Sequence, residues 1–163
     1  MAEIKIVKVA KDDEDQIIIG HAGFIKTAED LYEAMMNSVP GIKFGVAFAE
    51  ASGKCLVRGE GNDSKLIEKA EKNALSIGAG HTFVIIFRNG YPINVANALK
   101  NVPEVVSIYC ATANNVSVAV MDTGTGRVVL GIADGEKSRG IEGIKDKKER
   151  RKQLRDFGYK LSD

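Results

Sequence analysis

The fold is decided by the stretch Gln16-Ile17-Ile18-Ile19-Gly20-His21-Ala22-Gly23-Phe24-Ile25-Lys26-Thr27-Ala28-Glu29-Asp30. The three isoleucines predict a buried strand, and the residues from Thr27 to about Ser38 predict an amphipathic helix that stops at Pro40-Gly41. Thr27 is a good N-cap residue, and Asp30 follows it at the spacing of a capping box. The stretch therefore predicts a strand that leads through a short loop into a helix.

Working outward, the sequence alternates between strand and helix patterns. Strands are predicted over residues 4–9, 43–50, 55–58, 81–87, 105–113, 116–121 and 127–132, and helices over 64–77, 92–99 and 145–155. The apolar residues after the last helix are available to dock it, and no linker or repeat divides the chain. We expect residues 1–163 to form a single domain of the mixed α+β (α/β-type) class, with a mixed β-sheet flanked by three to four helices.

The composition argues against several classes of protein. A formal net charge of +1 gives no reason to expect binding to nucleic acid or to an anionic membrane. The longest fully apolar run is about five residues, whereas a transmembrane helix needs about 20. Cys55 and Cys110 are too few for a disulfide framework or a zinc site, and their apolar surroundings predict buried, reduced thiols. Because the charged N-terminus does not resemble a signal peptide, we expect a cytoplasmic protein.

Two histidines stand beside glycines at predicted strand ends. His21 is close in sequence to Lys26 and to a helix N-terminus, a combination that suits a phosphate group. His81 follows Gly78-Ala79-Gly80 and precedes the most apolar strand. If these two strands are neighbours, the imidazoles converge on one site; otherwise each is a surface or structural histidine.

Polar residues in loops offer further candidates. The amides of Asn94 and Asn114 suit an adenine edge or ribose hydroxyls, although helix capping and turn formation explain asparagines equally well. Asp134 is either a turn former or a ligand of a hydroxyl group or of magnesium. A Walker A loop, a Rossmann fingerprint and a metal-ligand spacing are all absent, so no resident metal is predicted. The basic clusters Lys147-Lys148 and Arg150-Arg151-Lys152 are typical of a solvated helix face.

Several ordered motifs together resemble one family, the adenosine-specific kinases of prokaryotes. The motifs are Phe24-Ile25-Lys26-Thr27-Ala28-Glu29-Asp30-Leu31, Phe44-Gly45-Val46-Ala47-Phe48, Glu50-Ala51-Ser52-Gly53-Lys54, Gly78-Ala79-Gly80-His81, Tyr91-Pro92-Ile93-Asn94-Val95 and Cys110-Ala111-Thr112-Ala113-Asn114. The resemblance runs from about residue 3 to residue 161. It implies binding of adenosine or AMP, phosphoryl transfer, a histidine that can carry phosphate, and a homo-oligomer that is trimeric or larger. ATP is a candidate phosphate donor and magnesium a candidate companion ion.

The hypothesis of an adenosine-specific kinase assigns roles to individual residues. Lys26 and Thr27 would hold the phosphate, Ser52, Gly53, Asn94 and Asn114 would contact the nucleoside, and Asp134 would hold magnesium or a hydroxyl group. In the family pattern a histidine immediately precedes Phe-Ile-Lys-Thr, but here that position is Gly23. The catalytic histidine is therefore either His21, two residues earlier on the same face of an extended chain, or His81. A non-catalytic adenosine or AMP sensor and an oligomeric scaffold are the alternative functions.

Overall fold

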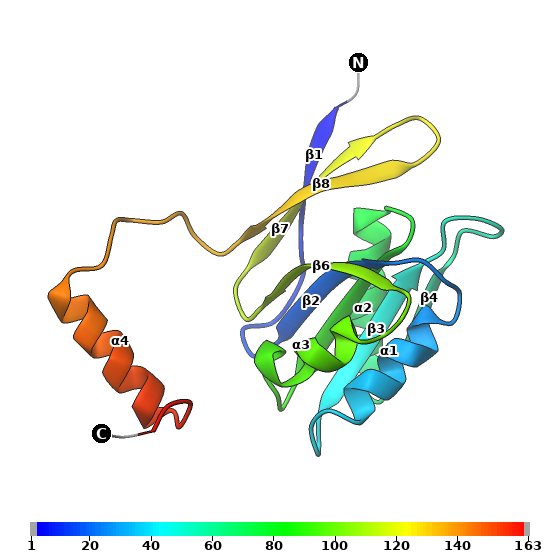
Figure 1. Ribbon diagram of the computed structural model, residues 1–163. Coiled ribbons are helices and arrows are strands. Elements are labelled where there is room, and N and C mark those ends of the chain that lie inside the picture. The colour runs from blue at the N-terminus through cyan, green and yellow to red at the C-terminus, as the bar shows by residue number, and fades with distance from the viewer. Residues whose placement is uncertain (1–2, 162–163) are drawn as a thin grey trace.

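The computed structural model describes residues 3–161, which form eight strands and four helices (Figure 1). In chain order the elements are β1 (Ile4–Lys8), β2 (Gln16–Ala22), α1 (Thr27–Met36), β3 (Lys43–Ala49), β4 (Val57–Gly61), α2 (Ser64–Ile77), β5 (Thr82–Arg88), α3 (Pro92–Lys100), β6 (Val105–Thr112), β7 (Val116–Asp122), β8 (Arg127–Asp134) and α4 (Ile144–Asp156). The predicted α+β class and the number of helices are confirmed.

The strands form two antiparallel sheets, so the prediction of one mixed sheet was wrong. One sheet has the order β4-β3-β5-β2-β6, and the other has the order β1-β7-β8. All pairings within both sheets are antiparallel in the part of the chain that the structure describes. Strands β2 and β3 point the same way, as a connecting helix favours, but β5 inserts between them and runs in the opposite direction.

The five-stranded sheet is covered on both faces. Helices α1 and α3 lie on one face, where Leu31, Met35, Val95 and Leu99 pack against the aromatic side chains of β3 and β5. The other face is covered by α2 and by the valines of β7 (Val116, Val118 and Val120). Burial on both faces explains why β2 and β5 are continuous apolar runs rather than alternating ones.

Helix α2 packs unusually close to β3. A Cβ atom at Gly45 would lie 2.2 Å from the backbone carbon of Leu66. The face of β3 formed by Gly45, Ala47 and Ala49 is small because the chain's own helix lies directly on it.

The start of α1 differs from the prediction. Lys26, not Thr27, is at the N-cap position, and its side chain makes no capping hydrogen bond to the backbone of the helix. Thr27 is the first helical residue; it is buried, and its hydroxyl donates to the backbone carbonyl of Phe24. The buried hydroxyl therefore fastens the loop before α1 and faces away from solvent.

The two cysteines differ in environment. Cys110 is buried, and burial raises the pKa of its thiol to about 11. Cys55 is exposed in the loop before β4, because that strand begins at Val57 and not at residue 55 as predicted. The prediction of a buried thiol is thus wrong for Cys55. Within residues 3–161, none of the helices has the length and apolar character needed to cross a membrane.

Candidate active site

The two histidines meet at one end of the five-stranded sheet. His21 lies near the end of β2, opposite Thr82 in β5, and His81 immediately precedes Thr82. Their ring centroids are 5.8 Å apart, with the rings edge to face at 73°. The hypothesis that the two imidazoles converge is therefore confirmed. The ring of Phe48 stacks on His81 with its centroid 5.9 Å away.

The backbone holds His81 in an unusual conformation. Its φ angle is +61°, in the left-handed region that few non-glycine residues occupy. Its N–H donates to the carbonyl of Ala49 at 2.7 Å, and its own carbonyl accepts from the N–H of Ala22 at 2.9 Å. A conformation that is costly and is fixed by hydrogen bonds to two strands fits a residue whose side chain must point in one direction.

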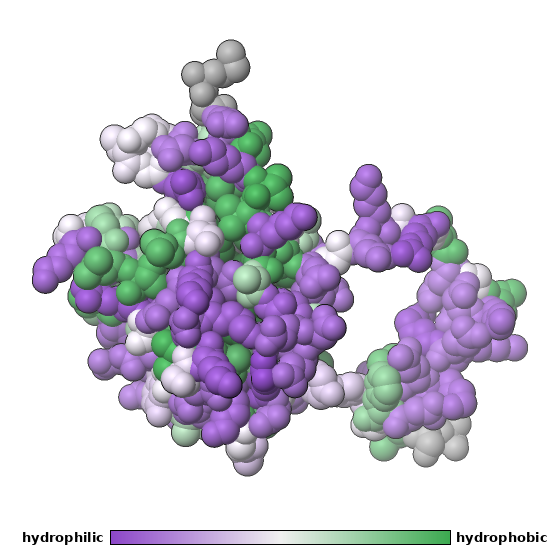
Figure 2. Space-filling view, turned by 180° about the vertical axis from the view of Figure 1, so that it is seen from behind, coloured by the Kyte–Doolittle hydropathy of each residue, from purple (hydrophilic) through white to green (hydrophobic). Residues whose placement is uncertain are grey.

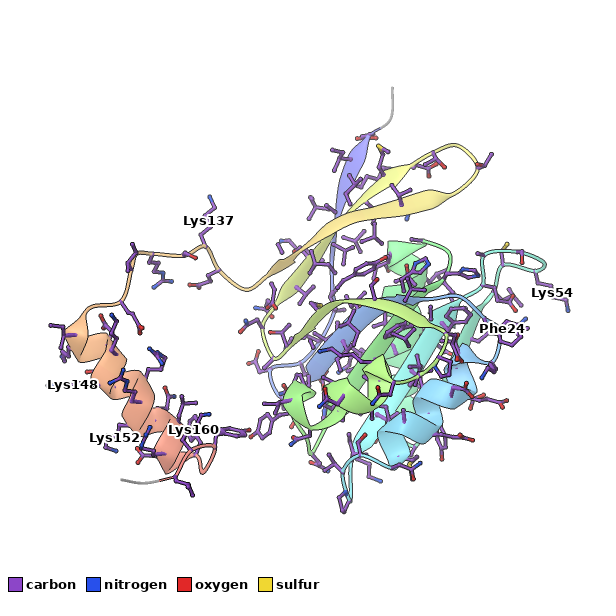
Figure 3. All side chains as sticks on the ribbon, in the orientation of Figure 1. Phe24, Lys54, Lys137, Lys148, Lys152 and Lys160 are labelled. Carbon is purple, nitrogen blue, oxygen red and sulfur yellow. The ribbon has the colours of Figure 1, made fainter. Side chains whose placement is uncertain are left out.

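His81 lines a pocket of about 590 Å³ that opens at this end of the sheet. The segment before α1 and the loop after β3 form its walls, and Figure 3 shows Phe24 and Lys54 near each other on that side of the molecule. Besides His81, the lining residues are Gly23, Phe24, Ile25, Phe48, Glu50, Ala51, Ser52, Gly53, Lys54 and Arg58. Ser52 and Gly53, predicted from the resemblance, therefore lie at the same pocket as His81.

An ion pair braces the loop that forms this wall. Glu50 Oε1 accepts hydrogen bonds from Arg58 Nε at 2.9 Å and Nη2 at 2.7 Å, and its Oε2 accepts from the N–H of Leu56 at 3.0 Å. The hydrogen bond from Leu56, followed by those from Arg58, lowers the pKa of Glu50. The pocket thus combines a carboxylate that stays charged with two cations, Arg58 and Lys54.

The environment favours the neutral form of His21. Burial lowers the pKa of this imidazole, and the electrostatic interaction with the neighbouring His81 lowers it further. A neutral imidazole has a free lone pair, which is the form that acts as a nucleophile or as a general base.

Lys26 is held by carboxylates beside the pocket. Its Nζ lies 2.7 Å from Asp30 Oδ2 and 3.6 Å from Glu104 Oε2. The hydrogen bond to Asp30 raises the pKa of Lys26, and burial raises the pKa of the Glu104 carboxyl. Lys26 is not among the residues that line the pocket.

The other predicted site residues lie elsewhere in the chain. Asn94 accepts a hydrogen bond from the N–H of Tyr91 at 2.9 Å at the start of α3, and it lines a different pocket together with Gln16. Gln16 and His21 are at opposite ends of β2, about 16 Å apart at the usual rise of a strand. Asn114 donates to Asp134 Oδ1 at 3.0 Å, and Asn114 lines a third pocket. The predicted nucleoside contacts are thus divided among three separate places.

Eight residues that line the pocket were not among the predicted site residues. The aromatic and charged ones are Phe24, Phe48, Glu50, Lys54 and Arg58, and the others are Gly23, Ile25 and Ala51. Arg58 and Glu50 are eight residues apart, and only the pairing of β3 with β4, which sets Phe48 opposite Arg58, brings them together. The turn at Ser52-Gly53 could have indicated them, because pairing the strands on either side of this turn brings Phe48, Glu50 and Arg58 together.

The described side chains contain no ready-made cluster of metal ligands. From residue 3 to residue 161, no group of three or more histidine, cysteine, aspartate or glutamate side chains is placed to hold a metal ion. Asp134 accepts a hydrogen bond from the side-chain amide of Asn114 at 3.0 Å.

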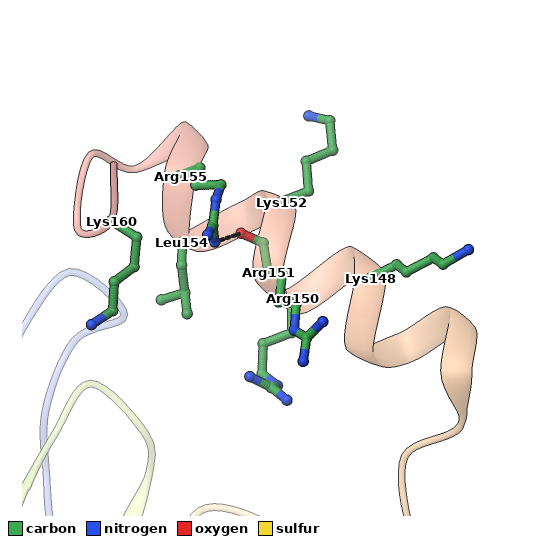
Figure 4. A pocket seen from close by; sticks show the side chains of 7 residues that line it. All are labelled: Lys148, Arg150, Arg151, Lys152, Leu154, Arg155 and Lys160. Atoms are coloured by element: carbon green, nitrogen blue, oxygen red, sulfur yellow. Dashed lines mark hydrogen bonds between the residues drawn. The ribbon is translucent and has the colours of Figure 1, made fainter. Parts of the chain in front are cut away.

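A fourth hollow, of about 720 Å³, lies on the surface of α4 (Figure 4). It is lined by basic side chains and Leu154, and one internal hydrogen bond joins Arg155 to the carbonyl of Arg151. The hollow is remote from the histidine pair, because α4 lies apart from both sheets (Figure 1).

Comparison with known proteins places the chain in a family. The sequence model of the family described as adenosine specific kinase matches residues 7–160. The chain belongs to this family. It is also similar to the PH1918 protein from Pyrococcus horikoshii OT3, whose crystal structure shares 45% sequence identity, covers 99% of this chain and 100% of its own, and superposes with a TM-score of 0.95. A search of curated proteins found no match.

Proposed function

We propose that this chain transfers a phosphoryl group between ATP and the 5′ oxygen of adenosine at the pocket lined by His81. The observation that carries the proposal is the pair of imidazoles 5.8 Å apart, one of which lines a pocket with cationic side chains. The family's description supports a kinase-like activity and adenosine as the nucleoside.

The two histidines have different tasks in the proposed reaction. A lone pair of the His81 imidazole attacks the γ-phosphorus of ATP, and the bond from that phosphorus to the leaving oxygen of ADP breaks. The 5′ oxygen of adenosine then attacks the same phosphorus, the phosphorus–nitrogen bond breaks, and AMP forms. His21, which is neutral, accepts the proton of the 5′ hydroxyl and later releases it to water.

The remaining pocket residues suit the two substrates. Lys54 and Arg58 place positive charge where a phosphate would lie, which stabilises the charge of the transferring group. Phe24 and Phe48 provide aromatic walls for a purine ring. Ser52 and Gly53 offer a hydroxyl and a backbone N–H to the ribose.

Lys26 and Thr27 support the pocket in this proposal. Thr27 fastens the segment that carries Phe24, and Lys26 adds positive charge at the start of α1, partly offset by Asp30 and Glu104. Asn94, Asn114 and Asp134 have no part in it, because Asn94 and Asn114 line other pockets and Asp134 is hydrogen-bonded to Asn114. We further propose that the enzyme works in the cytoplasm as a homo-oligomer, trimeric or larger, as the family resemblance implies.

A sensor that binds adenosine or AMP without chemistry is the second candidate. It is favoured by the pairing of Lys26 with two carboxylates, which offset its positive charge. This function predicts that adenosine raises the melting temperature while no phosphate moves.

The test is a transfer assay with γ-labelled ATP and magnesium, in which adenosine is compared with guanosine and cytidine. We expect labelled AMP only with adenosine, acid-labile label on the protein, and loss of both in His81→Ala. Lys54→Ala should slow transfer, whereas Lys43→Ala, at the far end of β3, is the matched control. Labelled AMP without labelled protein would indicate direct transfer from ATP to adenosine, with His81 as the base, in place of the covalent step. Binding of adenosine without any transfer would establish the sensor function. If adenosine neither bound nor reacted, the oligomeric scaffold would be the remaining function.

A further inference from the structure

Residues 135–161 form an arm that the rest of the chain does not support. The arm leaves the end of β8, runs through residues 136–143 without regular structure, and ends in α4 (Figure 1). None of the residues of α4 is buried, and Ile141 is fully exposed. Within the arm, Glu142 pairs with Arg150. Among residues 3–161, the docking expected from its apolar residues is not seen, because Phe157, Tyr159 and Leu161 are exposed and only Leu154 is partly buried.

A helix of this length has little stability alone. Helices shorter than about 12–15 residues are marginal in water unless a face of the helix is packed, and α4 has 13 residues. Yet the crystal structure from Pyrococcus horikoshii OT3 superposes with a TM-score of 0.95 over 99% of this chain. Residues 1–134 are only about four fifths of the chain, so that score requires the arm to superpose as well. Something outside the single chain must hold the arm there.

The sheet of β1, β7 and β8 has an uncovered apolar face. Register places Ile4, Met121 and Val128 in one row across the three strands, and Ile6, Ala119 and Gly131 in the next. Ile4 and Ile6 are 60% and 62% exposed, although the opposite face of the same sheet is buried. Figure 2 shows hydrophobic residues gathered over this part of the molecule. An antiparallel sheet that faces water on one side normally carries polar residues there, so this face needs a cover.

The charges of the two parts are complementary. Residues 135–163 contain ten lysines and arginines against six aspartates and glutamates, and several of these lysines extend from the arm in Figure 3. Residues 1–134 contain thirteen basic against sixteen acidic residues. A basic arm is therefore attracted to the acidic remainder of another copy, since its own chain directs it away from both sheets.

We propose that the arm of one chain packs on the apolar face of the β1-β7-β8 sheet of a second copy, so that Ile141 and Ile144 of the arm cover Ile4 and Ile6 of that copy. The exposed isoleucines on both sides then become buried, and the helix gains the packing it lacks alone. This association does not rest on the proposed phosphoryl transfer.

Light scattering or native mass spectrometry of the full chain tests the proposal. We expect the natural sequence to form an oligomer, and both the arm variant I141D/I144D and the sheet variant I4D/I6D to have the 17.6 kDa mass of one chain. All four side chains are exposed, so both variants should keep the natural circular dichroism spectrum. Leu75→Asp, at an exposed position of α2, is the control and should keep the natural mass.

Mixing the two variants identifies the occupant of the sheet face. The sheet variant has an intact arm and the arm variant has an intact sheet, so the mixture should form dimers of twice the single-chain mass. If the oligomer formed instead by contact between the sheets of two copies, mixing the two variants would not restore any dimer. A natural sequence that is monomeric, variants that keep the natural mass, or a mixture that stays monomeric would each overturn the proposal.

Discussion

Replacing Asp15 by asparagine tests the ionic cluster that joins the β1–β2 connection to α2 and β5. The Asp15 side chain is fully buried, with Oδ1 2.6 Å from Arg88 Nε, and Oδ2 accepting the N–H of Asp12 at 2.8 Å and the ammonium of Lys69. Removing one member of a buried ion pair costs about 3–5 kcal/mol because its partner keeps an uncompensated charge. Lys69 and Arg88 are partly exposed and both still pair with Asp12, so we expect the lower end, about 3 kcal/mol.

Thermal unfolding followed by circular dichroism measures this loss. For a chain of this size, 1 kcal/mol corresponds to about 2–4 °C, so Asp15→Asn should lower Tm by about 6–12 °C. The control is Glu14→Gln, which also removes a partner of Arg88 but at an exposed position, where the expected change is below about 1 kcal/mol. Equal shifts for the two variants would show that burial of the carboxylate has no special weight and would refute the reasoning.

The pH dependence gives a second readout of the same carboxylate. Burial alone would raise the pKa of Asp15, but hydrogen bonds from Lys69 and Arg88 lower it below the ordinary value of 3.8. Because the unfolded chain binds the proton more readily, the contribution of Asp15 is fully present above about pH 4 and is lost as pH falls through the lowered pKa. The Tm difference between the natural chain and Asp15→Asn should therefore be constant from about pH 5 upward and shrink below about pH 4.

Three further predictions concern the packing and the pocket. Gly45→Ala places a Cβ against the backbone of α2 and should cost about 3 kcal/mol or more in chemical denaturation, whereas Gly23→Ala, with open space around it, should change stability by less than about 1 kcal/mol. Glu50→Gln weakens the brace on the pocket loop, so adenosine should bind at least about threefold more weakly in calorimetry; an unchanged affinity would separate the brace from the pocket. Burial lowers the pKa of His21 below its ordinary value of 6.5, so the part of the pH profile of transfer that disappears in His21→Ala should be centred below pH 6.5; a missing component centred above that value would contradict the assigned role.

Local patterns predicted the elements well but not their arrangement. The isoleucines of β2 and the glycine-flanked His81 were sufficient to place strands and to bring the two histidines together as a hypothesis. The insertion of β5 between β2 and β3 was not predictable, because strand order depends on contacts between residues that are distant in sequence. The error at Thr27 has a local cause: its residue type is a good cap, but its hydroxyl donates to the carbonyl of Phe24 instead of accepting from the helix, and Lys26 takes the cap position.

The candidate site shows why motifs in one sequence need not share one pocket. Ser52, Gly53 and His81 meet because the β3–β4 hairpin and the start of β5 lie at the same end of the sheet. Asn94 is drawn to the other end because α3 begins only after β5 has crossed the sheet, and its amide is engaged in closing the first turn of that helix. The spacing of motifs along the chain does not show which end of the sheet each motif occupies, because that depends on the direction of the strand beside it. Asn94 lies about one strand length from the histidines. Within one chain the five-stranded sheet holds these residues apart, so Asn94 cannot contact a nucleoside that is bound at the histidines.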